Sequence, residues 1–183
     1  MTVTKKAPNQ IIRLALILFV VSAITSGVLG LVNYFTKDII AEREREKTAA
    51  AYQAVLPYDG EYETVAFDED AWETVNAISR AGDEGWVVEL TFSGAQSSIT
   101  AAFGVSAADY SITGASVIDH AETSGLGAKI TEPEFTDSFI GQTEGMAVTK
   151  DGGTVDSITA ATISSRAMAN AANTAIAAVK ALG

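Results

Sequence analysis

One stretch of the chain is apolar without interruption, whereas the rest alternates between apolar and polar positions. Residues 14–36 contain no charged side chain. As a helix, about 23 residues would extend roughly 34 Å, enough to span the hydrocarbon core of a bilayer. The pattern therefore predicts a transmembrane helix at 14–36, preceded by a short tail at 1–13.

A cleaved signal peptide is the alternative interpretation of this region. Residues 5–13 would supply its basic segment, residues 14–21 its apolar segment, and the Val-Ser-Ala at 21–23 its cleavage site. The apolar run continues to Phe35, however, and is too long for such a segment. We therefore expect the helix to be retained as an anchor.

The segment after the anchor, 37–57, is predicted to be a charged helix. The sign of the charge alternates through residues 41–47, which is typical of a solvated helix face, and Pro57 would end the helix. A polar, acidic segment at 58–85 follows, ahead of the first predicted strand.

Short runs of β-branched and aromatic residues predict the strands of the soluble domain. Strands are expected at 86–92, 98–105 and 110–119. Asp151-Gly152-Gly153 predicts a hairpin between 146–149 and 155–158.

The C-terminal segment, 163–182, is predicted to be a helix. It is rich in alanine, and apolar residues recur at helical spacing: Met168, Ala172, Ile176 and Val179. The fold class is therefore α+β, with a single transmembrane helix followed by a domain, 58–183, in which helices flank a mainly antiparallel sheet.

Charge is distributed unevenly along the chain. The whole chain has a net charge of −11, but from Lys37 onward 9 basic residues stand against 23 acidic ones, a net charge of −14. Such a surface repels phosphate backbones, which argues against nucleic-acid binding and against a domain that lies flat on anionic lipid. Basic residues flank both ends of the apolar run, so the positive-inside rule does not orient the anchor.

The residue types that are absent also restrict the chemistry. The chain has no cysteine, which excludes disulfides, thiolate metal sites, iron–sulfur clusters and cysteine nucleophiles. Its one histidine, His120, could act as a base or a metal ligand, but a structural or solvent-exposed role is favoured for a single histidine.

Two segments have compositions that suit ligand binding. Residues 156–165 combine a short strand, small or hydroxylated residues and a helix start, where free N–H groups attract a phosphate. Thr159 or Thr162 could instead simply cap the helix. Residues 120–127 place polar residues and a Gly-Leu-Gly turn after a strand, which is also the composition of a solvated loop.

These two segments resemble the paired signatures of the FMN-binding domain family. Thr159-Ala160-Ala161-Thr162 is similar to its flavinylation motif, (Ser/Thr)-Gly-Ala-Thr, and residues 120–127 to its His-x-Glu-Thr-Pro-Gly-Leu-Gly element. Their order behind one membrane span and a short charged helix is similar to that in the G subunits of Rnf electron-transport complexes. The C subunits of sodium-pumping NADH:quinone reductases are also similar.

The resemblance implies a set of site residues. Thr162 would carry FMN as a phosphoester, made by a flavin transferase that uses FAD as donor. Family positions that line the isoalloxazine ring correspond to Glu122, Thr123 and Leu126, and Gly127 is also expected to contribute to cofactor binding. Positions around the phosphate correspond to Thr159, Ala160, Ala161 and Ser164.

The resemblance further implies a membrane-anchored electron carrier. It would work within an ion-translocating ferredoxin:NAD oxidoreductase, with the other subunits and membrane lipid as partners and its domain on the extracytoplasmic face. The FMN subunit of a sodium-pumping quinone reductase or of an extracellular electron-transfer chain is a second possibility. A third is an anchored domain that has kept the fold but not the flavin.

Two residues depart from the family pattern. Ala160 replaces a glycine, which would cost about 1 kcal/mol or more if the position requires positive φ. Ser124 replaces a proline, which loosens the loop without removing a contact group.

Overall fold

The computed structural model describes residues 8–182 and contains one five-stranded antiparallel sheet with helical segments around it. The strands follow one another in sheet order: β1 (Glu63–Val65), β2 (Val75–Ala81), β3 (Gly85–Ser93), β4 (Ser98–Ser106) and β5 (Ile112–His120). The α-helices are α1 (Pro8–Val55), α2 (Pro133–Thr136) and α3 (Thr162–Ala181). The described residues also form three short 3₁₀ helices: η1 (Gly127–Thr131), η2 (Asp137–Phe139) and η3 (Thr149–Asp151).

The chain divides into two units between Arg45 and Glu46. Within the first unit, α1 is long and apolar enough to cross a membrane, judged by its length and composition. Its large apolar side chains are exposed in the isolated chain, among them Leu18, Phe19 and Phe35, each more than 60% exposed. Exposure of this extent is expected of a helix that contacts lipid or partner helices.

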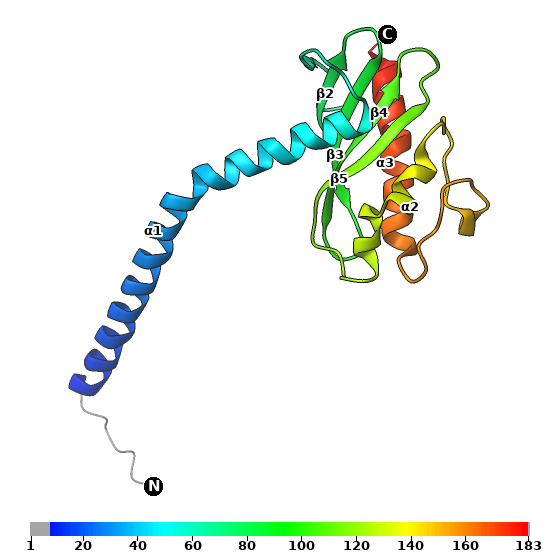
Figure 1. The fold of residues 1–183 in the computed structure, drawn as a ribbon. Helices are drawn as coiled ribbons and strands as arrows, with labels where there is room; N and C mark the ends of the chain where they lie inside the picture. The colour runs from blue at the N-terminus through cyan, green and yellow to red at the C-terminus, as the bar shows by residue number, and fades with distance from the viewer. Residues whose placement is uncertain (1–7, 183) are drawn as a thin grey trace. The chain divides into compact units, whose positions relative to one another are not determined.

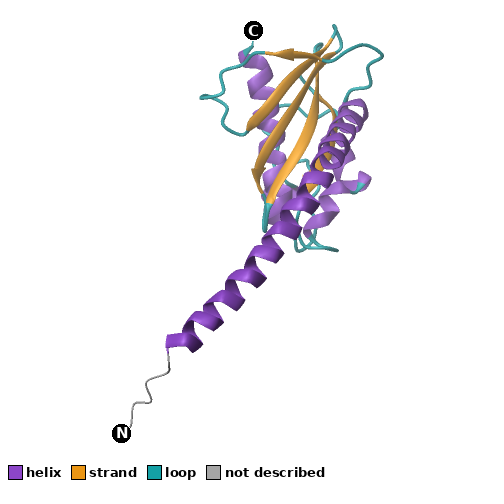
Figure 2. Ribbon diagram, turned by 90° about the vertical axis from the view of Figure 1, so that its left-hand side faces the viewer, coloured by secondary structure: helices purple, strands orange, loops and turns teal. Residues whose placement is uncertain are grey.

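In the second unit, the sheet buries apolar side chains on both of its faces. One face packs against α3, so that Leu90 and Phe103 lie in the same core as Met168 and Ile176. Figure 1 shows α3, drawn in orange to red, running along this face, and Figure 2 shows the strands as a single layer. All four residues of the predicted stripe on α3 are buried, which confirms that interpretation.

The opposite face of the sheet packs against the last turns of α1. Tyr52 and Val55 share a core with Val87 and Ala102. The hydroxyl of Thr113 donates a hydrogen bond to the carbonyl oxygen of Val55 (2.6 Å), a group that a helix end leaves without an intrahelical partner. The C-terminal end of α1 is therefore a structural part of the second unit.

A glycine permits this close approach of α1 to the sheet. A Cβ atom at Gly104 of β4 would overlap the carbonyl oxygen of Val55. Any larger residue at this position would push the last turn of α1 away from the sheet.

The fold class predicted from the sequence is confirmed, and the strands expected at 86–92, 98–105 and 110–119 correspond to β3, β4 and β5. The polar segment 58–85 contains two further strands, β1 and β2, which the sequence pattern did not indicate. β2 has the sequence Val-Asn-Ala-Ile-Ser-Arg-Ala, and its polar side chains mask the buried positions between them.

The hairpin predicted around Asp151-Gly152-Gly153 is wrong. Val148 and Val155 form a single parallel bridge, and the residues between them begin with η3. The amides of Asp151 and Gly153 both donate to the carbonyl oxygen of Val148, so the turn closes on itself instead of starting a ladder. Gly152 makes this possible with a left-handed φ of 85°.

Candidate functional site

A buried carboxylate, that of Glu122, joins three segments around the start of α3. Its Oε1 atom accepts hydrogen bonds from the backbone amides of Gln96 and Ser97, both at 3.0 Å, in the turn between β3 and β4. Its Oε2 atom accepts a hydrogen bond of 2.8 Å from the buried hydroxyl of Ser164 in the first turn of α3. Glu122 itself lies just after β5 and is 8% exposed.

The surroundings of Glu122 stabilise its charged form. Burial alone would raise its pKa, but the hydrogen bonds from Gln96, Ser164 and Ser97 outweigh burial, and the net effect is a lowered pKa. Gly127 allows this packing, because a Cβ atom there would lie 2.6 Å from Oε2 of Glu122. The carboxylate therefore acts as a fixed acceptor that holds the 120–127 loop against α3.

Thr162 occupies the first position of α3. The helix is capped by Ala161, and no side chain among the described residues makes a capping hydrogen bond there. The prediction that Thr159 or Thr162 caps the helix is therefore wrong. The hydroxyl of Thr162 lies instead at a helix start whose first N–H groups carry partial positive charge.

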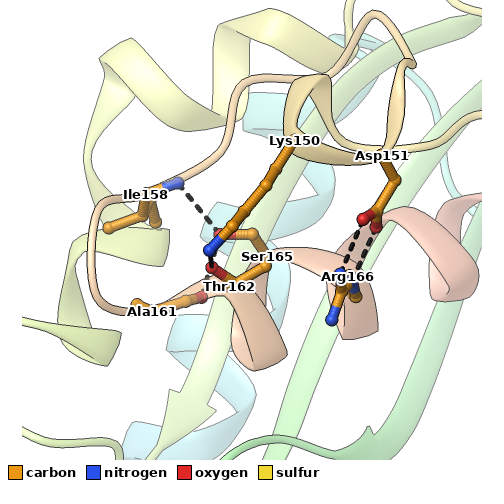
Figure 3. Close-up of polar contacts among 7 residues, drawn as sticks. All are labelled: Lys150, Asp151, Ile158, Ala161, Thr162, Ser165 and Arg166. Atoms are coloured by element: carbon orange, nitrogen blue, oxygen red, sulfur yellow. Dashed lines mark hydrogen bonds and ion pairs between the residues drawn. The ribbon is translucent and has the colours of Figure 1, made fainter.

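The turn η3 places charged side chains beside Thr162, as Figure 3 shows. The ammonium group of Lys150 donates a hydrogen bond of 3.3 Å to Oγ1 of Thr162. The next residue, Asp151, forms a bidentate pair with Arg166 of α3, with N–O distances of 2.5 and 2.6 Å. Hydrogen bonding to Arg166 lowers the pKa of Asp151, so this pair stays charged at neutral pH.

One buried hydroxyl, that of Ser165, braces the backbone before Thr162. The side chain of Ser165 accepts a hydrogen bond from the amide of Ile158 (3.1 Å) and donates one to the carbonyl oxygen of Ala161 (3.0 Å). The amide of Ala161 donates to the carbonyl oxygen of Ile158 (3.0 Å). The residues between them therefore form a tight turn.

Ala160 lies in this turn with a φ of 65°. This is the left-handed region that glycine adopts without steric cost and alanine does not. The position where the family pattern has glycine therefore does have a positive φ, the condition under which alanine is costly. The side chain of Ala160 is exposed, so the strain lies in the backbone alone.

Three of the other residues predicted for the site, Thr123, Leu126 and Thr159, are exposed. The hydroxyl of Thr123 donates to Oε1 of Gln96 at 2.9 Å. Leu126 and Ile163, the neighbour of Thr162 in the chain, expose 43% and 61% of their surface, respectively.

Two hollows adjoin the segment. One, of about 430 Å³, runs along α3 and includes Phe92, Ile163 and Ala167 in its lining. The other, of about 390 Å³, is more polar and includes Lys129, Ser157 and Thr159. Thr123 and Leu126 line neither of these two hollows.

His120 has a local structural role in this arrangement. It ends β5, and its Nδ1 atom accepts a hydrogen bond of 3.2 Å from the amide of Glu122. Within residues 8–182 there is no cluster of three or more acidic or histidine side chains arranged to hold a metal ion.

The sequence did not identify Lys150, Asp151 and Arg166 as part of the site. The Asp-Gly-Gly sequence indicated a hairpin. It did not indicate that Lys150 and Asp151 contact residues of α3. The pairing of η3 with α3 spans 12 to 15 residues and depends on the path of the intervening chain.

Glu122→Gln is expected to destabilise the folded domain in a pH-dependent way. The unfolded chain titrates this carboxyl at its ordinary pKa and the folded chain at a lower one, so the unfolded state binds more protons between the two values. The stabilisation by Glu122 is therefore complete above the unfolded pKa and is lost as the pH falls through the folded pKa. Removing the charge should cost about 1.5–3 kcal/mol at neutral pH.

Denaturant unfolding of the wild type and of Glu122→Gln between pH 3 and pH 7 measures this difference. The difference in the free energy of unfolding should shrink toward acid pH. Glu134→Gln, at an exposed carboxylate of α2, is the matched control and should have little effect. A Glu122→Gln difference that does not change with pH would contradict the assigned role of the charge.

Ala160→Gly is expected to stabilise the domain by up to about 1 kcal/mol. Relief of the left-handed strain is worth about 1–2 kcal/mol, part of which the greater freedom of glycine in the unfolded chain offsets. Ala161→Gly is the neighbouring control, because Ala161 is buried with a φ of −129° and should lose stability. Thermal unfolding compares the two, and a lower melting temperature for Ala160→Gly would argue against strain at this position.

Two family models match the chain. The model of the FMN-binding domain matches residues 94–177, which include Glu122 and Thr162, and the model of the RnfG N-terminal region matches residues 1–55. Together they cover α1, the strands β4 and β5 and most of α3.

Curated relatives match nearly the whole chain. The G subunit of an ion-translocating oxidoreductase complex from Methanosarcina acetivorans is 34% identical, over 92% of this chain and 94% of the relative. The G subunit of the Na(+)-translocating ferredoxin:NAD(+) oxidoreductase complex from Acetobacterium woodii is 33% identical, over 91% and 90%. Among solved structures, the C subunit of the Na(+)-translocating NADH-quinone reductase from Parabacteroides distasonis has a TM-score of 0.48 at 21% identity, covering 70% of this chain and 80% of that one.

The identity to the curated relatives, its extent and the two matching models agree with one another. The chain therefore belongs to the family of G subunits of ion-translocating oxidoreductase (Rnf) complexes and contains an FMN-binding domain.

Proposed function

We propose that this protein is the membrane-anchored electron-transfer subunit of an Rnf ferredoxin:NAD oxidoreductase and that it holds FMN covalently, as a phosphoester on Thr162. Membership of the family of Rnf G subunits and the FMN-binding domain support the general role. The covalent bond and its position are the specific part of the proposal.

The observation that carries the proposal is the environment of the Thr162 hydroxyl. It lies at the first position of α3, partly exposed, at a helix start that no described side chain caps. Such a helix start favours a phosphate through its free N–H groups. A flavin transferase would need a hydroxyl that it can reach from solvent, and Thr162 meets that requirement.

The residues around Thr162 suit the rest of an FMN molecule. Leu126 and Ile163 offer exposed apolar surface of the kind that a flavin ring covers. Glu122 holds the loop that bears Thr123 and Leu126 at a fixed position relative to α3. We propose that Thr123 and Leu126 lie against the ring and that Gly127, buried against Glu122, lets the loop hold them there. Thr159, Ala160, Ala161 and Ser164 would shape the phosphate end.

FMN exchanges one or two electrons and would supply the redox chemistry. The residues of this chain would bind and orient it. The hydrogen bonds that Glu122 accepts limit movement of the loop, and a rigid surround of this kind keeps the distance to a redox partner constant. The other subunits of the complex are the expected electron donors and acceptors.

The experiment that tests the attachment is intact-mass analysis of the full chain produced together with a flavin transferase. The wild type should gain the mass of one FMN moiety and fluoresce as a flavoprotein after denaturing electrophoresis. Thr162→Ala should lose both signals, whereas Thr143→Ala, which removes an exposed hydroxyl outside the proposed site, should keep them. A wild type without added mass would support the third possibility, a domain without flavin.

We also propose that the domain faces the extracytoplasmic side. A covalent bond is useful where free FMN is scarce and a lost cofactor cannot be replaced.

The helix that would cross the membrane continues without a break to Val55, whose side chain is buried in the domain. This continuity supports a retained anchor over a cleaved signal peptide.

Labelling of introduced cysteines tests this orientation, because the chain has none of its own. A membrane-impermeant maleimide should label Asp59→Cys, in an exposed segment of the domain, on intact protoplasts. It should label Thr4→Cys, before the apolar run, only after permeabilisation. The reverse pattern would place the domain in the cytoplasm.

A further inference from the structure

We infer that Lys150 is the cationic partner of the FMN phosphate at Thr162: its ammonium group binds the phosphoryl oxygens while the phosphoester forms and stays paired with the phosphodiester afterwards. This inference rests on the proposed attachment of FMN to Thr162. It adds a residue outside the flavinylation motif, 12 positions earlier in the chain.

The geometry already directs this ammonium group at the reacting atom. Lys150 Nζ lies 3.3 Å from Thr162 Oγ1, which would become the bridging oxygen of the phosphoester. The non-bridging phosphoryl oxygens would then be bonded to the phosphorus next to the atom that Lys150 now contacts. A small adjustment of a flexible, exposed lysine brings its ammonium group onto them.

The charge pattern around the turn leaves Lys150 available for an anion. Both oxygens of Asp151 accept hydrogen bonds from Arg166, so its interaction with Lys150 is limited to a coulombic attraction without a direct ion pair. Within residues 8–182, no carboxylate forms an ion pair with Lys150. From Lys37 onward the chain has only 9 basic residues against 23 acidic ones. A lysine that has no ion-pair partner among the described residues and that contacts the proposed attachment hydroxyl is therefore well suited to bind a phosphate.

The Asp151–Arg166 pair also gives the lysine a defined position. It ties η3 to the first turns of α3, and the 3₁₀ turn holds Lys150 on the side that faces Thr162 (Figure 3). The turn that the sequence predicted as a hairpin thus supports Lys150 beside the attachment site.

Lys150 would assist the transfer step through its positive charge. In that step Thr162 Oγ1 attacks the flavin-side phosphorus of FAD, and a new O–P bond forms as the P–O bond of the pyrophosphate breaks. AMP leaves with the bonding electron pair, and the hydroxyl proton passes to a base on the transferase. Lys150 stays protonated, and its charge offsets the negative charge that builds up on the phosphoryl oxygens.

The test measures the rate of flavinylation of full-length variants by a flavin transferase with FAD, followed by intact mass. Lys150→Gln should react roughly tenfold more slowly, the effect of losing one charge-assisted hydrogen bond. Lys150→Arg, which keeps the charge, should recover most of the rate. Lys180→Gln is the matched control. Lys180 is a half-exposed lysine near the C-terminal end of α3, far along the helix from Thr162, and it pairs with Glu144.

A second readout examines the product without any enzyme activity. The wild type, before and after flavinylation, is treated with an amine-acylating reagent and analysed by peptide mass mapping. Acylation of Lys150 should slow once FMN is attached, while Lys47 on α1 and Lys180 near the end of α3 serve as internal references and should not change. Circular dichroism of Lys150→Gln checks that the variant is folded.

Failure of the attachment and failure of the lysine contact give different results. A wild type that gains no mass overturns the proposed attachment and this inference with it. A wild type that is flavinylated, with Lys150→Gln modified at the same rate and Lys150 acylated equally fast in both forms, overturns the inference alone.

Discussion

The arrangement of the site depends on one buried charge, the carboxylate of Glu122. It accepts hydrogen bonds from the β3–β4 turn and from the first turn of α3, two segments that share no strand ladder. A buried carboxylate without these donors would be costly, and the same donors without the carboxylate would be unsatisfied. Glu122 therefore ties the loop that bears Leu126 to the helix that bears Thr162.

The sheet lies between α3, which bears Thr162, and the last turns of α1. One face packs against α3, and the other against the end of α1, where Thr113 and Gly104 receive the last turn of the helix. Apolar side chains fill both interfaces.

Polar composition and turn chemistry set the limit of what could be predicted. Strands β3 to β5 were predictable because β-branched and aromatic residues concentrate there, whereas the buried positions of β2, such as Ile78, are hidden between Asn76, Ser79 and Arg80. The Asp-Gly-Gly at 151–153 is a genuine turn signal. It could not reveal that the carbonyl oxygen of Val148 accepts hydrogen bonds from the amides of both Asp151 and Gly153, which close the segment into a 3₁₀ turn.

The sequence by itself determined the apolar anchor, the α+β class, the final helix and the motif around Thr162, because these depend on local composition and periodicity. Only the tertiary structure decided that Glu122 bonds Ser164, 42 residues away, that Lys150 reaches Thr162, and that Ala160 takes a left-handed conformation. The physical reason is that hydrogen bonds between distant side chains, and the backbone angles of a braced turn, depend on the path of the whole chain. No local propensity encodes that path.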